Sequence, residues 1–357
     1  MARKKLNDPA HIETDAIIAR MEKQIDKEYR QAHKEVSAKL EDYLKRFEAK
    51  DAKWREWVAN GTKTAEEYQK WVTGQAFMGK RWEQMKDTLA DGYVNAHKAA
   101  EGIVNGTMPE VFAINHNYGT YLIEKGARVN TSYTLYNRDA VARILRDNPK
   151  LYGKPGAKVA KQIRDGVLKK WDRQQIQSVM IQGILQGESI TNLTKRLEKV
   201  TGGEHAAAIR NARTMTTGVQ SAGRREAFVR AEKMGIKNKK VWVATLDGRT
   251  RHWHRELDGV AIDNDEYFEN EYGKIFEPGD PDADGANIYN CRCTLDAQIE
   301  GHEIDYSDMS LRYDRGLGDM SYDEWKAERS SKSNPIDRQE KVGEAIRQSY
   351  IREYRDG

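Results

Sequence analysis

The apolar residues near the start of the chain recur at helical spacing. They lie three or four residues apart in a pattern that repeats every eleven residues, which is about 3.67 residues per turn and predicts a long, nearly straight α-helix. The stripe consists of Ile18, Met21, Ile25, Tyr29, Ala32, Val36, Leu40, Tyr43 and Phe47. Because one narrow stripe needs a partner surface, this helix is expected to pack against a second one.

A second helix with a single apolar stripe follows after a short break. Asn60-Gly61 is typical of a helix end, and Thr64 with Glu67 three residues later is a capping-box pattern that begins a new helix. The second stripe runs through Trp82, Met85, Leu89, Tyr93, Ala96 and Ala100 and stops at Asn105-Gly106. Residues 1–106 are therefore predicted to form a long antiparallel helical hairpin in which the two stripes bury each other.

The next region, residues 107–235, is predicted to be a helical middle region. Its first part, residues 107–137, is rich in Tyr, Asn, Gly and Val and predicts a loop-rich crossover with a short strand pair. Helices are then predicted up to a stop at Gly187, from an N-cap at Ser189 to about Val200, and from about His205 to Met234, closed by Gly235.

The composition changes at Lys240. The residues "VWVATLDG" are β-branched and aromatic, and the stretch after them mixes short apolar clusters with Gly, Pro, Asp and Asn, which is typical of short strands and turns. We predict a small α/β module over residues 236–301 and, over residues 302–357, a charged tail that becomes ordered only against a partner, with Ser321 as a helix N-cap. The predicted fold class is mainly α with this small C-terminal α/β module.

The charge balance argues against a protein that binds nucleic acid through bulk charge. Sixty Lys+Arg against fifty-six Asp+Glu give a net charge of +4 over 357 residues, and the two signs are interleaved as on solvated helix faces. Hydrophobic residues make up 38% and charged residues 32%, which fits an elongated helical body better than a compact globule. One basic cluster, Lys237, Lys239 and Lys240, is interpreted as a solvated turn.

Cysteine usage and hydropathy indicate the compartment. Two cysteines spaced C-x-C cannot staple a secreted scaffold and favour a reducing environment. No apolar run resembles an export signal or approaches a membrane span. We therefore expect a protein that is made in the cytoplasm and has no membrane partner.

Candidate metal ligands lie in "TLDGRTRHWHRELDG", residues 245–259, and in "NCRC", which contains both cysteines. If the first segment is extended, His252 and His254 share one face, and Cys291 and Cys293 stand in the same relation. Two imidazoles and two thiolates match the ligand set of a closed tetrahedral zinc site. The spacing departs from the usual C-x₂₋₄-C, so buried apolar cysteines without any cofactor are the competing interpretation.

An enzymatic hypothesis uses the same segment. Asp247, His254 and Asp258 would supply a general base or hold a metal for phosphodiester hydrolysis, with Arg249 and Arg251 on the phosphate. The alternative is a structural knot in which arginines fork onto carboxylates and fix a turn-rich fold. We favour the structural alternative because the sequence shows no second acid–base cluster, and we expect His254 to hydrogen bond or ligate within the knot.

The same residues carry a resemblance to a known family. "VWVATLDGRTRHWHRELDGV", "FEPGDP" and "NCRC" resemble the pattern W-x-A-T-x-D-x-R-T-R-x-x-H-x-x-L-D-G followed by C-R-C of the Mu-F-like phage head morphogenesis proteins, also called minor head or minor capsid proteins. The matching positions are Trp242, Asp247, Arg249, Arg251, His254, Leu257, Asp258, Gly259, Cys291, Arg292 and Cys293. His252 falls on a variable position, and Met215 stands where many members have Glu, so a role of that acid is absent here. The resemblance is specific over about residues 165–295.

The resemblance implies a structural protein of the virion and not an enzyme. Members of the family enter the procapsid in few copies, associate with the portal, and act in head assembly, DNA packaging or genome ejection. For this chain it implies the phage portal protein, the major capsid or scaffolding protein and phage genomic DNA as partners. It also implies a place inside the capsid near the portal, and in the host cytoplasm during assembly.

Overall fold

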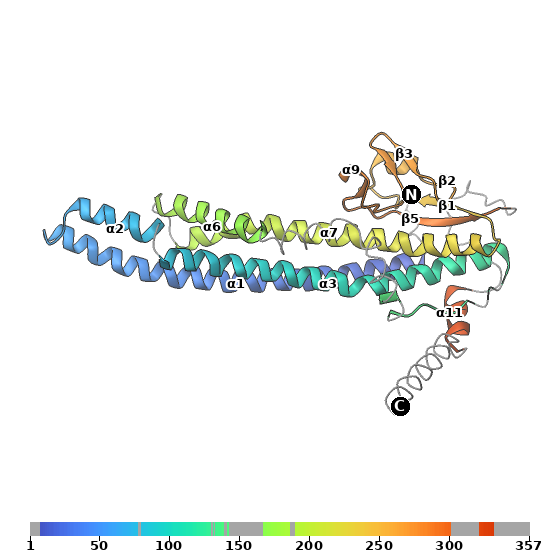
Figure 1. Ribbon diagram of the computed structural model, residues 1–357, viewed down its shortest axis with the longest axis horizontal. Helices are drawn as coiled ribbons and strands as arrows, with labels where there is room; N and C mark the ends of the chain where they lie inside the picture. Colours follow the sequence, from blue (N-terminus) through green and yellow to red (C-terminus); the bar gives the residue numbers. More distant parts are fainter. Residues whose placement is uncertain are drawn as a thin grey trace, which may run out of the picture. The chain divides into compact units, whose positions relative to one another are not determined.

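The computed structural model describes residues 8–77, 80–129, 131, 133–138, 141–142, 167–185, 190–300 and 321–331. Helices dominate, and a few short antiparallel strands follow in the C-terminal region (Figure 1). This confirms the predicted fold class. The predicted helix stop at Gly187 and N-cap at Ser189 lie outside the described residues.

The chain forms two compact units, and neither is continuous in sequence. Unit 1 contains residues 1–18, 107–153 and 213–357, and unit 2 contains residues 19–106 and 154–212. Helices α1 (Pro9–Ala59), α3 (Lys80–Ala127) and α7 (Ile190–Lys233) each contribute one part to each unit. Unit 2 also contains α2 (Ala65–Phe77) and α6 (Val167–Leu185).

Unit 2 is a bundle built on the predicted stripes. Its core joins four helices through Val36, Leu40 and Leu44 of α1, Met85, Leu89, Ala90 and Tyr93 of α3, Ile176 and Val179 of α6, and Leu193 and Leu197 of α7. Along α1 the buried stripe includes Ile17 and Leu44 where the spacing predicted Ile18 and Tyr43. The break after α1 is as predicted, with Gly61 at φ 77° and reciprocal Thr64–Glu67 backbone-to-side-chain hydrogen bonds of 3.1 and 2.9 Å.

Two predicted interruptions are absent because the helices continue through them. The crossover and strand pair predicted over residues 107–137 are wrong for 107–127, which complete α3. Nearly every residue from Met108 to Glu124 is buried, and a helix that is covered on all sides shows no amphipathic period. The break predicted before His205 is also wrong, since α7 runs through Gly202-Gly203, although each glycine costs a helix about 1 kcal/mol relative to alanine.

Unit 1 contains the C-terminal sheet. Strand β1 (Asn238–Val243) lies between β2 (Ala261–Ile262) and β5 (Thr294–Ile299), and both pairings are antiparallel. A small hairpin of β3 (Phe268–Asn270) and β4 (Gly273–Ile275) and two short helices, α8 (His252–Glu256) and α9 (Gly285–Ile288), complete the region. The sheet packs on the end of α7 (Figure 1), where Ala227, Phe228 and Ala231 share a core with Trp242 and Leu295.

One lysine of the predicted basic turn is buried in this sheet. Lys240 lies on β1, its Nζ donates to the carbonyl oxygen of Phe276 at 2.9 Å, and it stands 3.6 Å from the centre of the Phe276 ring. Burial lowers the pKa of Lys240 to about 8, against the opposing effect of Glu277. The solvated-turn interpretation is therefore wrong for Lys240.

The tail folds back onto its own chain over residues 321–331. Helix α11 (Tyr322–Ser331) is capped by Ser321, as predicted, and Ser321 forms a reciprocal capping box with Glu324. Trp325 is buried, and its indole N–H donates to Glu124 of α3 at 2.7 Å. This part of the tail is thus ordered without a partner, contrary to the prediction. Within the described residues, no helix combines the length and apolar character needed to cross a membrane.

Candidate functional site

The first motif segment is a loop that leaves β1 and returns to it. Trp242 is fully buried on β1, and its backbone N–H and carbonyl bond to Val260 and Gly259 at 3.0 and 2.8 Å. Gly259 has a φ of 82°, a left-handed conformation that favours glycine at this turn. Asp258 closes the base of the loop, since its Oδ1 accepts from the backbone N–H of Ala244 at 2.9 Å. These residues serve the architecture of the loop.

Asp247 joins this loop to the cysteine segment. Its carboxylate receives both terminal nitrogens of Arg292, at 2.5 and 2.7 Å, and accepts from the backbone N–H of Arg249 at 2.8 Å. The hydrogen bond from Arg292 holds the pKa of Asp247 far below its usual range. The fork of an arginine on a carboxylate is the arrangement that the structural-knot hypothesis expects.

The other motif arginines contact backbone atoms. Arg251 donates to the carbonyl oxygen of Tyr289, and Arg255 donates to that of Asp247 at 2.9 Å. Arg249 takes part through its backbone N–H, while its side chain is exposed. Arg292 therefore pairs with a carboxylate, that of Asp247, whereas Arg251 and Arg255 bond to carbonyl oxygens.

His254 and the two cysteines meet in the interior of unit 1. All three are buried, and Nδ1 of His254 lies 3.7 Å from Sγ of Cys291 and 3.6 Å from Sγ of Cys293. The imidazole packs edge-on against Trp242 at 5.2 Å. The two thiols hydrogen bond to each other, and this bond together with burial raises the pKa of Cys293. For Cys291 the same bond lowers the pKa, with a further lowering by His254, although burial acts in the opposite direction.

The four-ligand zinc set predicted from the sequence is not brought together. His254, Cys291 and Cys293 have their ligand atoms within 4.8 Å of one another. The side chain of His252 is 68% exposed and pairs with Glu271 at 3.0 Å. A closed zinc site needs four protein ligands, and within the described residues this group offers three, so it does not fit the closed site. The three side chains form a hydrogen-bonded imidazole–dithiol group.

The nuclease constellation is not assembled either. Asp247 is bound to Arg292, Asp258 to the backbone of Ala244, and His254 to the thiols. Each of the three therefore has a different partner, and none of these contacts presents a free acid–base pair to a substrate.

A layer of polar residues on α7 is a further part of the site, and the sequence analysis missed it. Arg224 is buried, forms an ion pair with Asp8 at 2.6 Å, and donates to Asn115 at 3.1 Å and to the carbonyl oxygen of Leu295 at 2.8 Å. One turn earlier, Gln220 donates to Thr294 at 2.8 Å. The layer also includes Thr217, which donates to the carbonyl oxygen of Cys291 at 2.8 Å. The sequence did contain a signal for this layer, since polar residues three or four positions apart lie on one face of a helix.

The ion pair between Asp247 and Arg292 predicts a pH dependence of stability. Because the folded pKa of Asp247 lies below the unfolded value of about 3.9, the pair stabilises the fold above that value and its contribution is lost as pH falls. Asp247→Asn should destabilise unit 1 at pH 7 by about 1 kcal/mol, since both side chains are about one third exposed. Melting temperature measured from pH 7 to pH 3 should fall less for this variant than for the native chain.

A matched control is Asp263→Asn, which removes a more exposed ion pair, to Lys239, from the same module. Its melting curve should follow that of the native chain at every pH. Parallel curves for Asp247→Asn and the native chain would contradict the assigned role of Asp247.

Comparison with known proteins gives one family and several relatives. Residues 174–296 match the family model described as phage Mu protein F-like protein. The minor head protein GP7 of Bacillus phage SPP1 is 25% identical over 319 residues, which are 89% of this chain and 95% of that protein. An NAD(+)–arginine ADP-ribosyltransferase of Enterococcus faecalis, EFV, is 30% identical over 213 residues, which are 58% of this chain and 41% of that protein.

An uncharacterized protein of Haemophilus influenzae is 27% identical over 213 residues, 57% of this chain and 40% of that protein. The chain thus spans about two fifths of the Enterococcus and Haemophilus relatives and nearly all of the phage one. No solved structure matches.

Proposed function

We propose that this chain, which belongs to the Mu-F-like family of phage head morphogenesis proteins, is a minor head protein that binds the portal protein through the aromatic end of its helical hairpin. The match to a phage minor head protein over 95% of that protein's length supports a head protein. The portal as partner, and the interior of the capsid as location, are our inferences from the family.

The observation that carries the docking surface is an aromatic cluster on α1 and α2, here called the hairpin tip. It consists of Phe47, Trp54, Trp57, Tyr68 and Trp71. The ring centres of its contacting pairs are 5.3 to 6.2 Å apart. Trp57 is 39% exposed, and none of the residues from 45 to 72 is buried. Partly exposed tryptophan and tyrosine side chains are typical of the energetic centres of protein interfaces.

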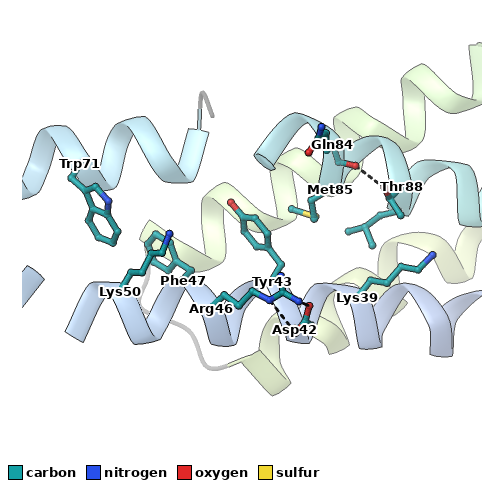
Figure 2. Close-up of a pocket in the computed structure, with 11 residues that line it drawn as sticks. Lys39, Asp42, Tyr43, Arg46, Phe47, Lys50, Trp71, Gln84, Met85 and Thr88 are labelled. Atoms are coloured by element: carbon teal, nitrogen blue, oxygen red, sulfur yellow. Dashed lines mark hydrogen bonds and ion pairs between the residues drawn. The ribbon is translucent and has the colours of Figure 1, made fainter. Parts of the chain in front are cut away.

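A pocket of about 370 Å³ adjoins the hairpin tip. Figure 2 shows Tyr43, Phe47, Trp71 and Met85 around it. Charged side chains of α1 also line it, namely Lys39, Lys50 and the ion pair of Arg46 with Asp42. A pocket with apolar walls suits a partner that inserts an aromatic or aliphatic side chain.

The charges on α1 favour a protein partner over DNA at this surface. Basic residues on this helix pair with acids four residues earlier, as in Arg30–Asp26, Lys45–Glu41 and Arg55–Asp51. Such pairs reduce the positive potential that would attract phosphate. A contact with genomic DNA during packaging or ejection, and with the major capsid or scaffolding protein, is a secondary part of the proposal.

We assign no transferase chemistry to this chain. The stretch shared with the Enterococcus transferase makes up 41% of that protein, whereas the alignment with the phage head protein extends over 95% of the latter. The shared stretch is therefore better explained as a head-protein region. The geometry of Asp247, His254 and Asp258 gives no support to the nuclease alternative.

The docking proposal predicts a loss of portal binding on removal of an exposed tryptophan. Trp57→Ala should weaken binding to purified portal rings at least tenfold, since truncation of an interface tryptophan typically costs about 2 kcal/mol or more. Co-sedimentation at varied portal concentration measures the effect. Trp57 is exposed, so the melting temperature should change little.

The matched control is Trp171→Ala, which removes a tryptophan of equal exposure, 38%, from α6 in the same unit. Binding by this variant should equal that of the native chain. Equal binding by Trp57→Ala and the native chain would refute the hairpin tip as the docking surface.

A further inference from the structure

A second group of ligating side chains lies inside the bundle of unit 2. His97 of α3, Asp172 of α6 and Glu204 of α7 have ligand atoms within 4.8 Å of one another. His97 and Asp172 are buried, and the side chain of Glu204 is 9% exposed. Three helices thus direct one imidazole and two carboxyl groups to the same buried point.

The carboxyl groups of this cluster lack the partners that buried acids need. Asp172 is 2% exposed, and its oxygens receive no hydrogen bond from an N–H or neutral O–H donor; the group beside them is the carboxyl of Glu204. Oε1 of Glu204 is also unpaired, while Oε2 lies 3.1 Å from Nε2 of His97. Among the described residues, no lysine or arginine forms an ion pair with either acid. Buried charges in proteins are paired or coordinate metals.

His97 is oriented in the way that metal-bound histidines are. Its Nδ1 is 2.5 Å from the hydroxyl of Tyr29, which leaves Nε2 facing the carboxyl groups. Tyr29 is itself held by stacking on His205 at 4.9 Å and by an edge contact with His97 at 5.5 Å. A hydrogen bond at the second ring nitrogen fixes the orientation of a ligating imidazole and raises its basicity.

Burial disfavours the charged forms of both acids when no cation lies beside them. Burial raises the pKa of Asp172 to about 8, with a further contribution from Glu204, and burial also raises the pKa of Glu204. A divalent ion would neutralise both carboxylates at once.

We propose that His97, Asp172 and Glu204 bind a divalent transition-metal ion that fastens α3, α6 and α7 together. One imidazole nitrogen with carboxylate oxygens suits zinc and its neighbours manganese, iron(II) and cobalt. Three protein ligands leave coordination positions for water or for the second oxygen of a carboxylate. The site is independent of the docking proposal and differs from the imidazole–dithiol group in its donor atoms, which are nitrogen and oxygen without sulfur.

The test is a titration of the full chain, freed of metal by a chelator, with Co²⁺. Native protein should bind one equivalent with no sulfur-to-cobalt charge-transfer band, because the ligands are nitrogen and oxygen. Asp172→Asn should weaken this binding at least about a hundredfold. Loss of a residue that hydrogen bonds to a metal ligand weakens metal affinity about 10- to 100-fold, and loss of a ligand itself should cost at least as much. Co²⁺ should raise the melting temperature of the native chain and not that of the variant.

Two controls separate the possible outcomes. Cys291→Ser removes a thiol of the other cluster and should leave the sulfur-free Co²⁺ equivalent unchanged. Asp87→Asn removes a surface acid of α3 that pairs with Arg173 and should also bind as the native chain does. Asp172→Asn keeps the side-chain shape and removes an unpaired buried acid, so the metal-free variant should melt no lower than the native chain.

The proposal is overturned if Asp172→Asn binds Co²⁺ as tightly as the native chain. It is equally overturned if the native chain binds no Co²⁺, or binds it only with a charge-transfer band that disappears in Cys291→Ser. Loss of portal binding in the same variants would bear on the docking proposal alone.

Discussion

Gly279→Ala is expected to destabilise unit 1 by about 2–5 kcal/mol, from a left-handed backbone that costs about 1–2 kcal/mol and overpacking that costs about 1–3 kcal/mol. Gly279 belongs to the "FEPGDP" segment and has a φ of 81°. A Cβ at this position would lie 2.4 Å from the backbone nitrogen and 2.8 Å from the Cα of Gly218 on α7. Both obstructing atoms belong to a helix backbone, which cannot rotate away as a side chain can.

Two further glycines separate the causes of this effect. Gly235→Ala tests the left-handed conformation alone, since Gly235 has a φ of 87° and open space around it; the expected cost is about 1–2 kcal/mol. Gly218→Ala tests the contact alone, because a Cβ there would lie 2.7 Å from the carbonyl oxygen of Gly279. Urea unfolding followed by near-ultraviolet circular dichroism measures all three. A cost for Gly279→Ala no larger than that for Gly235→Ala would disprove the close contact.

Arg224→Met is expected to destabilise unit 1 by about 3–5 kcal/mol, the typical cost of removing one partner of a buried ion pair. The change leaves Asp8 buried without a counter-charge and removes donors from Asn115 and from the carbonyl oxygen of Leu295. Arg224→Lys should fall between native and Arg224→Met, because an ammonium group keeps the charge but cannot fork onto several acceptors.

The partner residue provides the decisive comparison for Arg224. In a double variant, Asp8→Asn with Arg224→Met, the unpaired buried charge is absent, so the loss of free energy should be smaller than the sum of the two single losses. Arg249→Met is the control for loss of an exposed arginine and should change the free energy of unfolding by less than about 0.5 kcal/mol. A cost below about 1 kcal/mol for Arg224→Met would contradict the anchoring role, since typical point variants cost about that much.

Local patterns were sufficient for the elements whose signals are short-range. The stripe along α1 follows from helical spacing of apolar residues, and the start of α2 follows from the Thr64–Glu67 capping box. Strand β1 follows from its β-branched and aromatic residues, and α11 is capped by Ser321 as its capping pattern indicates. In each case the interactions that stabilise the element join residues a few positions apart, so the sequence displays them directly.

The proposed pairing of the two histidines failed for a local reason. The i,i+2 argument for His252 and His254 assumed an extended segment, but both residues lie on α8. Two positions on a helix are about 200° apart around its axis, because one turn takes 3.6 residues. His254 therefore points to Cys291 and Cys293 while His252 is left at the surface with Glu271.

Other features arose from contacts between distant segments. The full burial of α3 beyond Gly106 erased its amphipathic pattern, and Lys240 is buried because the ring of Phe276 covers it. Asp8 and Arg224 meet across 216 positions, and His97, Asp172 and Glu204 come from three helices. Spacing along the chain reports which residues share a face of one element, but it contains no information on which faces meet, and burial, counter-charges and ligand sets depend on that meeting.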